Sequence, residues 1–355
     1  MESGGLLKSR STDPMQLHEV NAGTMRISRN SSLCLTLSSF LFALLLAVPA
    51  QAQDGIETIR IESELVELKV SVLGVSPSTH TPLLEQKDFV VLEDGKPQEI
   101  EFFESAEAPF DLVLLLDLSG SNSSKLKMIK SSAKRFVDSA RPVDRIAVVA
   151  FTERPALYSP FTLDRKKLKR SIDDMDDAVG GTNFWDSLNF VLQHIIAHGP
   201  GTHRSAVVVM TDGIDNALTE VPGPGSVISF ETLLANVRDS ETIVFPIYLD
   251  TEEEIVRDFK KLRVTRVDYA LAREQLGQIA SACATNMYRA SKLSDLDSLY
   301  GQVIRDLSTV YSIGYRPSNK ALDGKWRSVE VKLPGQASLL ARTKRGYFAR
   351  QDTEP

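Results

Sequence analysis

The sequence predicts an α/β fold: a doubly wound, mostly parallel sheet with a flanking small β-sandwich built from N- and C-terminal segments. Between residues 110 and 310, short apolar runs alternate with amphipathic stretches of helical period, which is typical of a parallel sheet covered on both faces. Residues 54–108 and 311–350 instead show strand-like runs separated by turn signals. The chain has 355 residues, about twice the ~150 residues expected of one domain.

The N-terminus has the composition of a secretory signal peptide. Its apolar run of 16 residues is shorter than the ~20 that a membrane-spanning helix needs. The parts of the signal are the basic residues Arg26 and Arg29, the apolar run Leu33–Val48 and the A-x-A cleavage site Ala50-Gln51-Ala52. We therefore expect residues 1–52 to be a signal peptide, with Met25 as an alternative start. The mature chain is expected to be secreted or periplasmic, with no membrane span; a cytosolic chain with a buried N-terminal helix is the alternative.

Composition excludes several classes of protein. Lys and Arg total 41 against 47 Asp and Glu, a formal net charge of −6, whereas a nucleic-acid-binding protein should carry a basic stripe. The hydrophobic and charged fractions, 42% and 25%, are ordinary for a globular protein and exclude wholesale disorder. The two cysteines, Cys34 and Cys283, allow neither a cysteine-based zinc site nor a disulfide framework.

The flanking segments have β-strand patterns. Residues 53–108 contain alternating apolar positions and the turn Asp94-Gly95 between strand-like runs, which predict four short strands including a hairpin. Residues 311–355 are too short to bury a core alone. We expect them to pair with the N-terminal segment, so that the α/β region is an insertion in one sandwich. Two separate β pieces are the alternative.

Within residues 110–310 the hydrophobic pattern predicts four core strands and six helices. Leu126, Ile129 and Phe136 share one face of the first helix, and Asp164 is a plausible cap for the second. The expected strands are Leu112–Leu116, Ile146–Phe151, Ala206–Met210 and Ile243–Leu249. The expected helices are Lys125–Ala140, Asp164–Met175, Phe184–Ala197, Phe230–Ser240, Ala270–Ala282 and Leu293–Ser308.

Three loops of this region carry polar side chains suited to chemistry. Asp117-Leu118-Ser119-Gly120-Ser121 follows the first core strand, Gly180-Gly181-Thr182 precedes a helix, and Thr211-Asp212-Gly213 follows the third core strand. Each alone has a simpler interpretation, as a helix cap or a turn. Open α/β sheets, however, bind ligands at the carboxyl ends of their strands, where these loops can converge.

Together the loops supply oxygen ligands and neither Cys nor His. This set favours a hard cation, Mg²⁺, Mn²⁺ or Ca²⁺, over zinc. The candidate metal ligands are Asp117, Ser119, Ser121, Thr182 and Asp212. If the neutral hydroxyls bind directly and the carboxylates act partly through water, the ion stays electron-poor. It could then accept a carboxylate, so we expect a protein partner that presents Asp or Glu.

The order of these motifs resembles the metal-ion-dependent adhesion site of von Willebrand factor type A domains, over residues 110–310. The resemblance implies direct coordination by Ser119, Ser121 and Thr182, and a largely water-mediated role for the two aspartates. It also implies a six-stranded sheet with one short antiparallel edge strand, here Ala156–Phe161. The closing helix, Leu293–Ser308, shifts in some relatives when ligand binds.

The flanks resemble a narrower group, the exported bacterial VWFA-related acidobacterial-type family. The segments that carry this resemblance are Lys87–Phe103, Tyr311–Pro317, Leu322–Val331 and Arg345–Phe348. One departure is Asn122-Ser123-Ser124, where many type A domains have Met or Val after the last serine of the first motif. This change leaves the candidate ligands alone and alters the rim that a partner would touch.

The sequence therefore predicts an exported, cation-dependent protein-binding module for adhesion or interaction, and no enzyme. Ser119 lacks the G-x-S-x-G context of a hydrolase. His194 and His198 are one helical turn apart, but without H-E-x-x-H they indicate a solvated helix face rather than zinc. The alternatives are a structural module of an envelope assembly, with the ion serving only the fold, and an ATPase-coupled subunit, which the signal peptide argues against.

Overall fold

The computed structural model describes most of the chain after residue 64. The described residues are 65–76, 81–120, 125–175, 180–201, 203–218, 221, 223–252 and 264–349. The expected signal peptide and Ser121 lie outside the described residues. No helix in the described part is long and apolar enough to cross a membrane.

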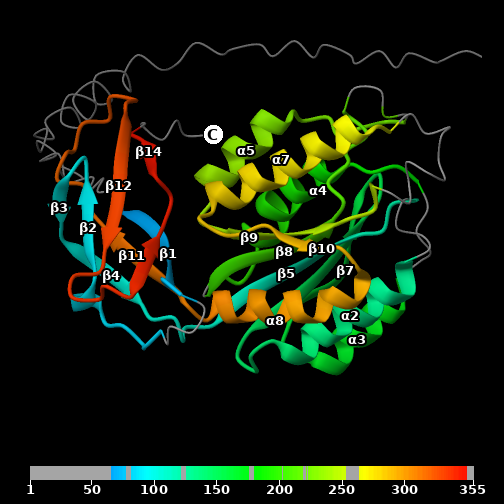
Figure 1. Cartoon of the computed structure of the whole chain (residues 1–355), viewed down its shortest axis with the longest axis horizontal. Helices are drawn as coiled ribbons and strands as arrows, with labels where there is room; N and C mark the ends of the chain where they lie inside the picture. Colours follow the sequence, from blue (N-terminus) through cyan, green and yellow to red (C-terminus); the bar gives the residue numbers. More distant parts are fainter. Residues whose placement is uncertain are drawn as a thin grey trace, which may run out of the picture. The chain divides into compact units, whose positions relative to one another are not determined.

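A six-stranded sheet forms the centre of the α/β region, in the order β10-β9-β8-β5-β6-β7 (Figure 1). Its strands are β5 (Phe110–Asp117), β6 (Arg145–Phe151), β7 (Pro155–Thr162), β8 (Arg204–Thr211), β9 (Ile243–Leu249) and β10 (Tyr288–Ala290). The pairs are parallel except for β7, which runs antiparallel to β6 at one edge. The predicted fold class is confirmed, and the expected edge strand lies within β7.

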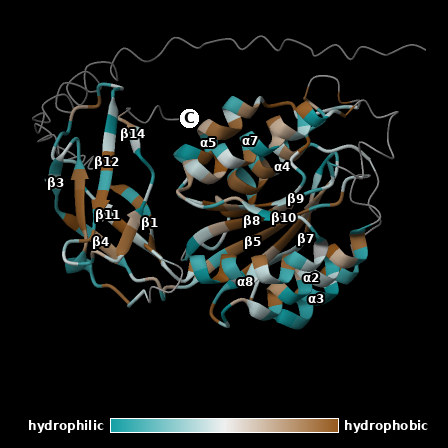
Figure 2. Ribbon diagram, in the orientation of Figure 1, coloured by the Kyte–Doolittle hydropathy of each residue, from teal (hydrophilic) through white to brown (hydrophobic). Residues whose placement is uncertain are grey.

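Helices cover both faces of this sheet (Figure 1). On one face are α2 (Leu126–Ser139), α3 (Arg165–Asp173) and α8 (Leu296–Leu307); on the other are α4 (Phe184–Phe190), α5 (Phe230–Asp239) and α7 (Arg266–Ala282). Every residue of β5 is buried, and its side chains alternate between the two cores. Figure 2 shows the result as hydrophobic strands between helices whose outer faces are hydrophilic.

Two helices differ from expectation. The helix expected over Phe184–Ala197 leaves α geometry after Phe190 and continues as a π-helix, η3 (Val191–Ile196). The helix expected to start at Ala270 begins at Arg266. Its earlier start follows from a capping box in which Thr265 and Asp268 each accept a hydrogen bond from the other's backbone N–H. The short strand β10 was not among the expected strands.

The flanking segments form two antiparallel sheets, β13-β1-β11-β4 and β14-β12-β2-β3. Their strands are β1 (Val66–Gly74), β2 (Val90–Glu93), β3 (Lys96–Gln98), β4 (Ile100–Glu104), β11 (Val310–Tyr315), β12 (Trp326–Lys332), β13 (Leu339–Arg342) and β14 (Gly346–Phe348). Strands β1 and β11 pair, as do β2 and β12, so each sheet contains strands from both sides of the α/β region. Asp94 (φ 47°) and Gly95 (φ 76°) form the β2–β3 hairpin turn, whose positive φ angles suit its twist.

A buried arginine joins the two segments that connect the α/β region to these sheets. Arg204, the first residue of β8, donates to the backbone carbonyls of Ala106 (3.1 Å) and Ala108, which lie before β5. It also donates to the carbonyl of Val310, the first residue of β11, and its guanidinium lies 4.0 Å from the Phe110 ring centroid. One side chain therefore holds the chain where it enters and where it leaves the α/β region.

Candidate metal site

The first candidate ligand, Asp117, ends strand β5 and is fully buried. Its Oδ1 accepts a hydrogen bond from the Ser119 backbone N–H (2.9 Å), and its Oδ2 accepts one from the Thr211 hydroxyl (2.6 Å). Thr211 ends β8, one residue beyond the Leu116–Met210 pair of the parallel register. From the sequence Thr211 was part of the third motif but not a candidate ligand, and its hydrogen bond to Asp117 was not expected, although this register places the two residues side by side.

The second candidate aspartate, Asp212, directly follows β8, and two hydrogen bonds fix its carboxylate. Its Oδ1 accepts from the Ile214 backbone N–H (3.2 Å), and its Oδ2 accepts from the Thr251 hydroxyl (2.9 Å). The Thr251 Oγ1 atom also lies 3.1 Å from the hydroxyl of Tyr269 on α7. Neither Thr251 nor Tyr269 was a candidate from the sequence, because their contact with Asp212 arises only in the folded chain.

Backbone hydrogen bonds join the three motif loops. The Gly120 N–H donates to the Gly180 carbonyl (3.2 Å), which links the first and second loops. The Asn216 N–H donates to the Thr182 carbonyl (2.8 Å), which links the second and third. The structure therefore brings together the loops that carry four of the five candidate ligands, and the fifth, Ser121, lies outside the described residues.

Neither Ser119 nor Thr182 occupies the N-cap position of the helix that follows it in the described structure. Helix α2 has Lys125 at its N-cap position, and α4 has Asn183 there; neither makes a side-chain capping hydrogen bond. Ser119 and Thr182 are nevertheless almost fully buried, at 1% and 6% exposure.

The electrostatics of the site favour a cation. Burial, followed by the neighbouring charge of Asp212, raises the pKa of Asp117 to about 7, and hydrogen bonds from Ser119 and Thr211 act in the opposite direction. Two adjacent buried carboxylates are costly without a countercharge. The described residues include no group of three or more His, Cys, Asp or Glu side chains that could hold a metal ion. The other candidate donors are hydroxyls. Such an all-oxygen set fits Mg²⁺, Mn²⁺ or Ca²⁺.

Residues 112–214 match the family model of the von Willebrand factor type A domain. This type A match spans all five candidate ligands. An uncharacterised protein of Borreliella burgdorferi is 30% identical over 116 residues, which are 30% of this chain and 33% of that protein. The chain thus matches about a third of the length of this relative.

Two solved structures are similar to the chain at low sequence identity. The vWF domain of the type V pili tip protein Mfa5 from Porphyromonas gingivalis is 15% identical, with 56% of this chain and 94% of that chain covered and a TM-score of 0.41. Proximal thread matrix protein 1 from the mussel byssus, solved with a zinc-occupied MIDAS motif, is 17% identical, with coverages of 59% and 48% and a TM-score of 0.43.

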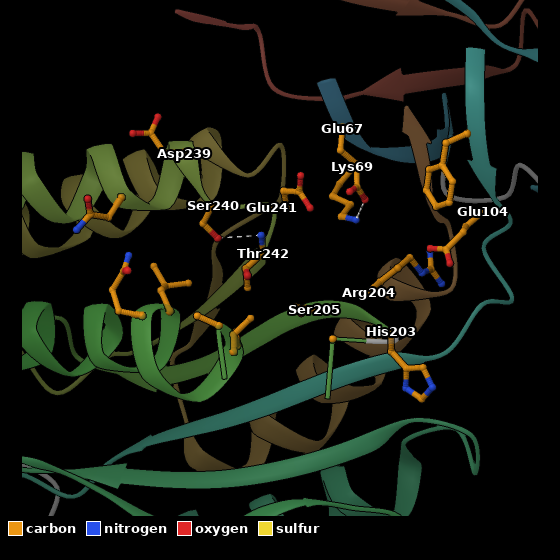
Figure 3. A pocket seen from close by; sticks show the side chains of 17 residues that line it. Glu67, Lys69, Glu104, His203, Arg204, Ser205, Asp239, Ser240, Glu241 and Thr242 are labelled. Carbon is orange, nitrogen blue, oxygen red and sulfur yellow. Dashed lines mark hydrogen bonds and ion pairs between the residues drawn. The ribbon is translucent and has the colours of Figure 1, made fainter. Parts of the chain in front are cut away.

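A separate cavity of about 520 Å³ lies at the other end of β8 from the three motif loops, by Arg204 and Ser205 (Figure 3). Thr211 is seven positions after Arg204 along β8, about 23 Å at ~3.3 Å per residue of strand. The walls of the cavity carry charges of both signs, including the ion pair of Glu67 and Lys69. This mixture lacks the oxygen-rich character of the motif loops, so the cavity is not part of the candidate site.

Proposed function

We propose that this chain is an exported protein-binding module whose type A domain holds a divalent cation, and that the ion accepts an acidic side chain of a protein partner. The ligands would be Asp117, Ser119, Ser121, Thr182 and Asp212, and the ion Mg²⁺, with Mn²⁺ or Ca²⁺ as alternatives. The observation that carries the proposal is the pair of buried carboxylates, Asp117 and Asp212, on loops joined to two buried hydroxyl residues.

The hydrogen bonds of the two aspartates support an acidic partner. All four of their carboxylate oxygens accept a hydrogen bond from the protein. These donors draw negative charge away from the ion position, and they suit carboxylates that act through water. Neutral hydroxyls as direct ligands would leave the ion with unsatisfied positive charge, which a carboxylate from a partner can neutralise.

A peptide display experiment tests this function. The full-length chain is panned against a random peptide library in Mg²⁺, and bound peptides are eluted with EDTA. We expect Asp- or Glu-containing peptides to be enriched, because a carboxylate completes the coordination of the ion. Asp117→Ala should weaken binding of the selected peptides by about 10- to 100-fold, the range typical of damage to a metal site.

The matched control is Asp138→Ala, which removes an exposed carboxylate of α2 that pairs with Lys169. This variant should bind the peptides like the wild type. Peptides without acidic residues, or binding that survives EDTA, would contradict the proposal. Metal binding without any selected peptide would favour the alternative, a structural module in which the ion serves the fold.

A further inference from the structure

We propose that Asn216 and Asp215 are positioning residues that hold Thr182 in place for the metal ion. The inference deepens the proposed function, and it rests on that metal site. Both residues follow the third motif, within four positions of Asp212, and neither is a candidate ligand. Their contacts instead run to the second motif loop and to the start of helix α4.

Asn216 forms hydrogen bonds with both the N–H and the carbonyl of Thr182. The Asn216 backbone N–H donates to the Thr182 carbonyl (2.8 Å), and the Asn216 side-chain Oδ1 accepts from the Thr182 N–H (3.1 Å). Two hydrogen bonds between the same two residues fix the peptide planes that flank Thr182. The direction of the Thr182 Cα–Cβ bond follows from those planes, so Asn216 restricts the positions that the Thr182 hydroxyl can take.

Two glycines make room for the Asn216 amide. A Cβ atom added to Gly181 would lie 2.3 Å from Asn216 Nδ2, and one added to Gly223 would lie 2.6 Å from the same atom. Real Cβ atoms do not approach so closely. The nearest atoms around the Gly181 position all belong to Asn216, which explains a glycine directly before Thr182 in the second motif.

Asp215 fastens the same loop to helix α4. Its fully buried carboxylate accepts four hydrogen bonds. The donors are the backbone N–H groups of Trp185 (3.0 Å), Ala217 (2.8 Å) and Ser226 (3.0 Å), and the Ser226 hydroxyl (2.7 Å). Because Trp185 lies in the first turn of α4, this carboxylate prevents the third loop from moving away from the helix that follows Thr182.

The contacts of the two residues make one unit of the second and third motifs. Asp212 and Asn216 belong to the same short loop, so a shift of that loop would carry Asp212 and Thr182 together. The ion would then meet donors already set in their relative positions. Loss of the two Asn216 hydrogen bonds should therefore lower the affinity for the metal ion more than it lowers the stability of the fold.

A double-mutant cycle tests this role. Asn216→Ala, Gly181→Ala and the double variant are compared in the full-length chain, with the Mg²⁺ dissociation constant from calorimetry and the Tm in EDTA as readouts. We expect each single variant to weaken Mg²⁺ binding by about 10- to 100-fold, as loss of an outer-sphere partner typically does. The double variant should resemble Asn216→Ala alone, because the added methyl group then has no amide to displace.

Gly277→Ala is the control, since a Cβ at this α7 position meets nothing within 4 Å; it should bind Mg²⁺ like the wild type. Unchanged affinity in Asn216→Ala, or strictly additive effects in the double variant, would overturn the proposal. If Asn216→Ala does not fold, Gly181→Ala alone decides by the same criterion. A wild type that binds neither Mg²⁺, Mn²⁺ nor Ca²⁺ would overturn the metal site itself, a distinct result that removes both proposals.

Discussion

The chain should unfold at a higher temperature in Mg²⁺ than in EDTA, and Asp212→Asn should abolish this difference. An ion that binds only the native state stabilises it by RT ln(1 + [L]/Kd), about 2.7 kcal/mol at 100 times Kd. For a domain of this size the rise in Tm is about 5–10 °C, at roughly 2–4 °C per kcal/mol. Calorimetric unfolding scans of the two proteins at a series of Mg²⁺ concentrations measure it.

The same variant should behave differently without metal. Burial, and after it the Asp212 charge, raises the pKa of Asp117 to about 7, so the Asp212 charge adds to the cost of an ionised Asp117. Asn at position 212 removes one charge and can keep both hydrogen bonds, accepting from Ile214 and donating to Thr251. In EDTA we therefore expect Asp212→Asn to be at least as stable as the wild type, so that the order of stability reverses in Mg²⁺.

Asp138→Asn is the control for this comparison, because it removes an exposed carboxylate and should retain the full response to Mg²⁺. A wild type with the same Tm in EDTA and in all three cations would refute a working ion site. A full Mg²⁺ response in Asp212→Asn would show that this carboxylate takes no part in it.

Arg204→Ala should lower the free energy of unfolding by at least about 3 kcal/mol. The variant removes three hydrogen bonds from a charged donor, to the carbonyls of Ala106, Ala108 and Val310, and a hydrogen bond to a charged group contributes about 1.5–3 kcal/mol. The carbonyls of Ala106 (3.2 Å) and Ala108 (3.0 Å) keep a second donor, the guanidinium of Arg141. Burial lowers the pKa of Arg204 to about 10, so the guanidinium remains charged at neutral pH. Urea unfolding in EDTA, followed by circular dichroism, measures the loss.

Arg135→Ala provides the contrast. Arg135 lies on the exposed side of α2 and pairs with Asp297 at the surface, where ion pairs contribute about 0–1 kcal/mol. Its loss should therefore be small. If Arg204→Ala were no more destabilising than Arg135→Ala, the contacts of Arg204 with the two connecting segments would not matter to stability.

The spacing of hydrophobic residues predicted most of the fold, because buried strands and the buried faces of helices each have a characteristic spacing of apolar residues in the sequence. β5 and β9 appear as continuous apolar runs, and the face of α2 appears at every third or fourth position. The features missed leave weaker signals. Strand β10 has only three residues, and the first turn of α7 lies in a charged stretch whose capping box is visible only through Thr265 and Asp268.

The site was predictable to the extent that its residues follow strands. Asp117 and Asp212 stand at the ends of β5 and β8, so the rule for open α/β sheets located them. Thr251 and Asn216 could not be located this way, because their roles depend on contacts with residues 39 and 34 positions away. In the sequence Asn216 is an ordinary loop residue. Its role becomes visible only in the structure, where its side chain lies in the space that the absent side chains of Gly181 and Gly223 leave free.

The interleaved strands of the two flanking sheets also set an order of folding. Strand β1 pairs with β11 and β13, so the backbone hydrogen bonds of β1 cannot form until β11 and β13 are present; Val66, for example, pairs with Tyr315. Closing so long a loop in a flexible chain carries a large entropic cost, and distant pairings form slowly. The α/β region is continuous in sequence and can form first. Once it has, Arg204 holds residues 106 and 310 close together, and the long loop becomes a short one. As the chain emerges from its N-terminus, the first strand to appear, β1, is thus among the last to find its partners.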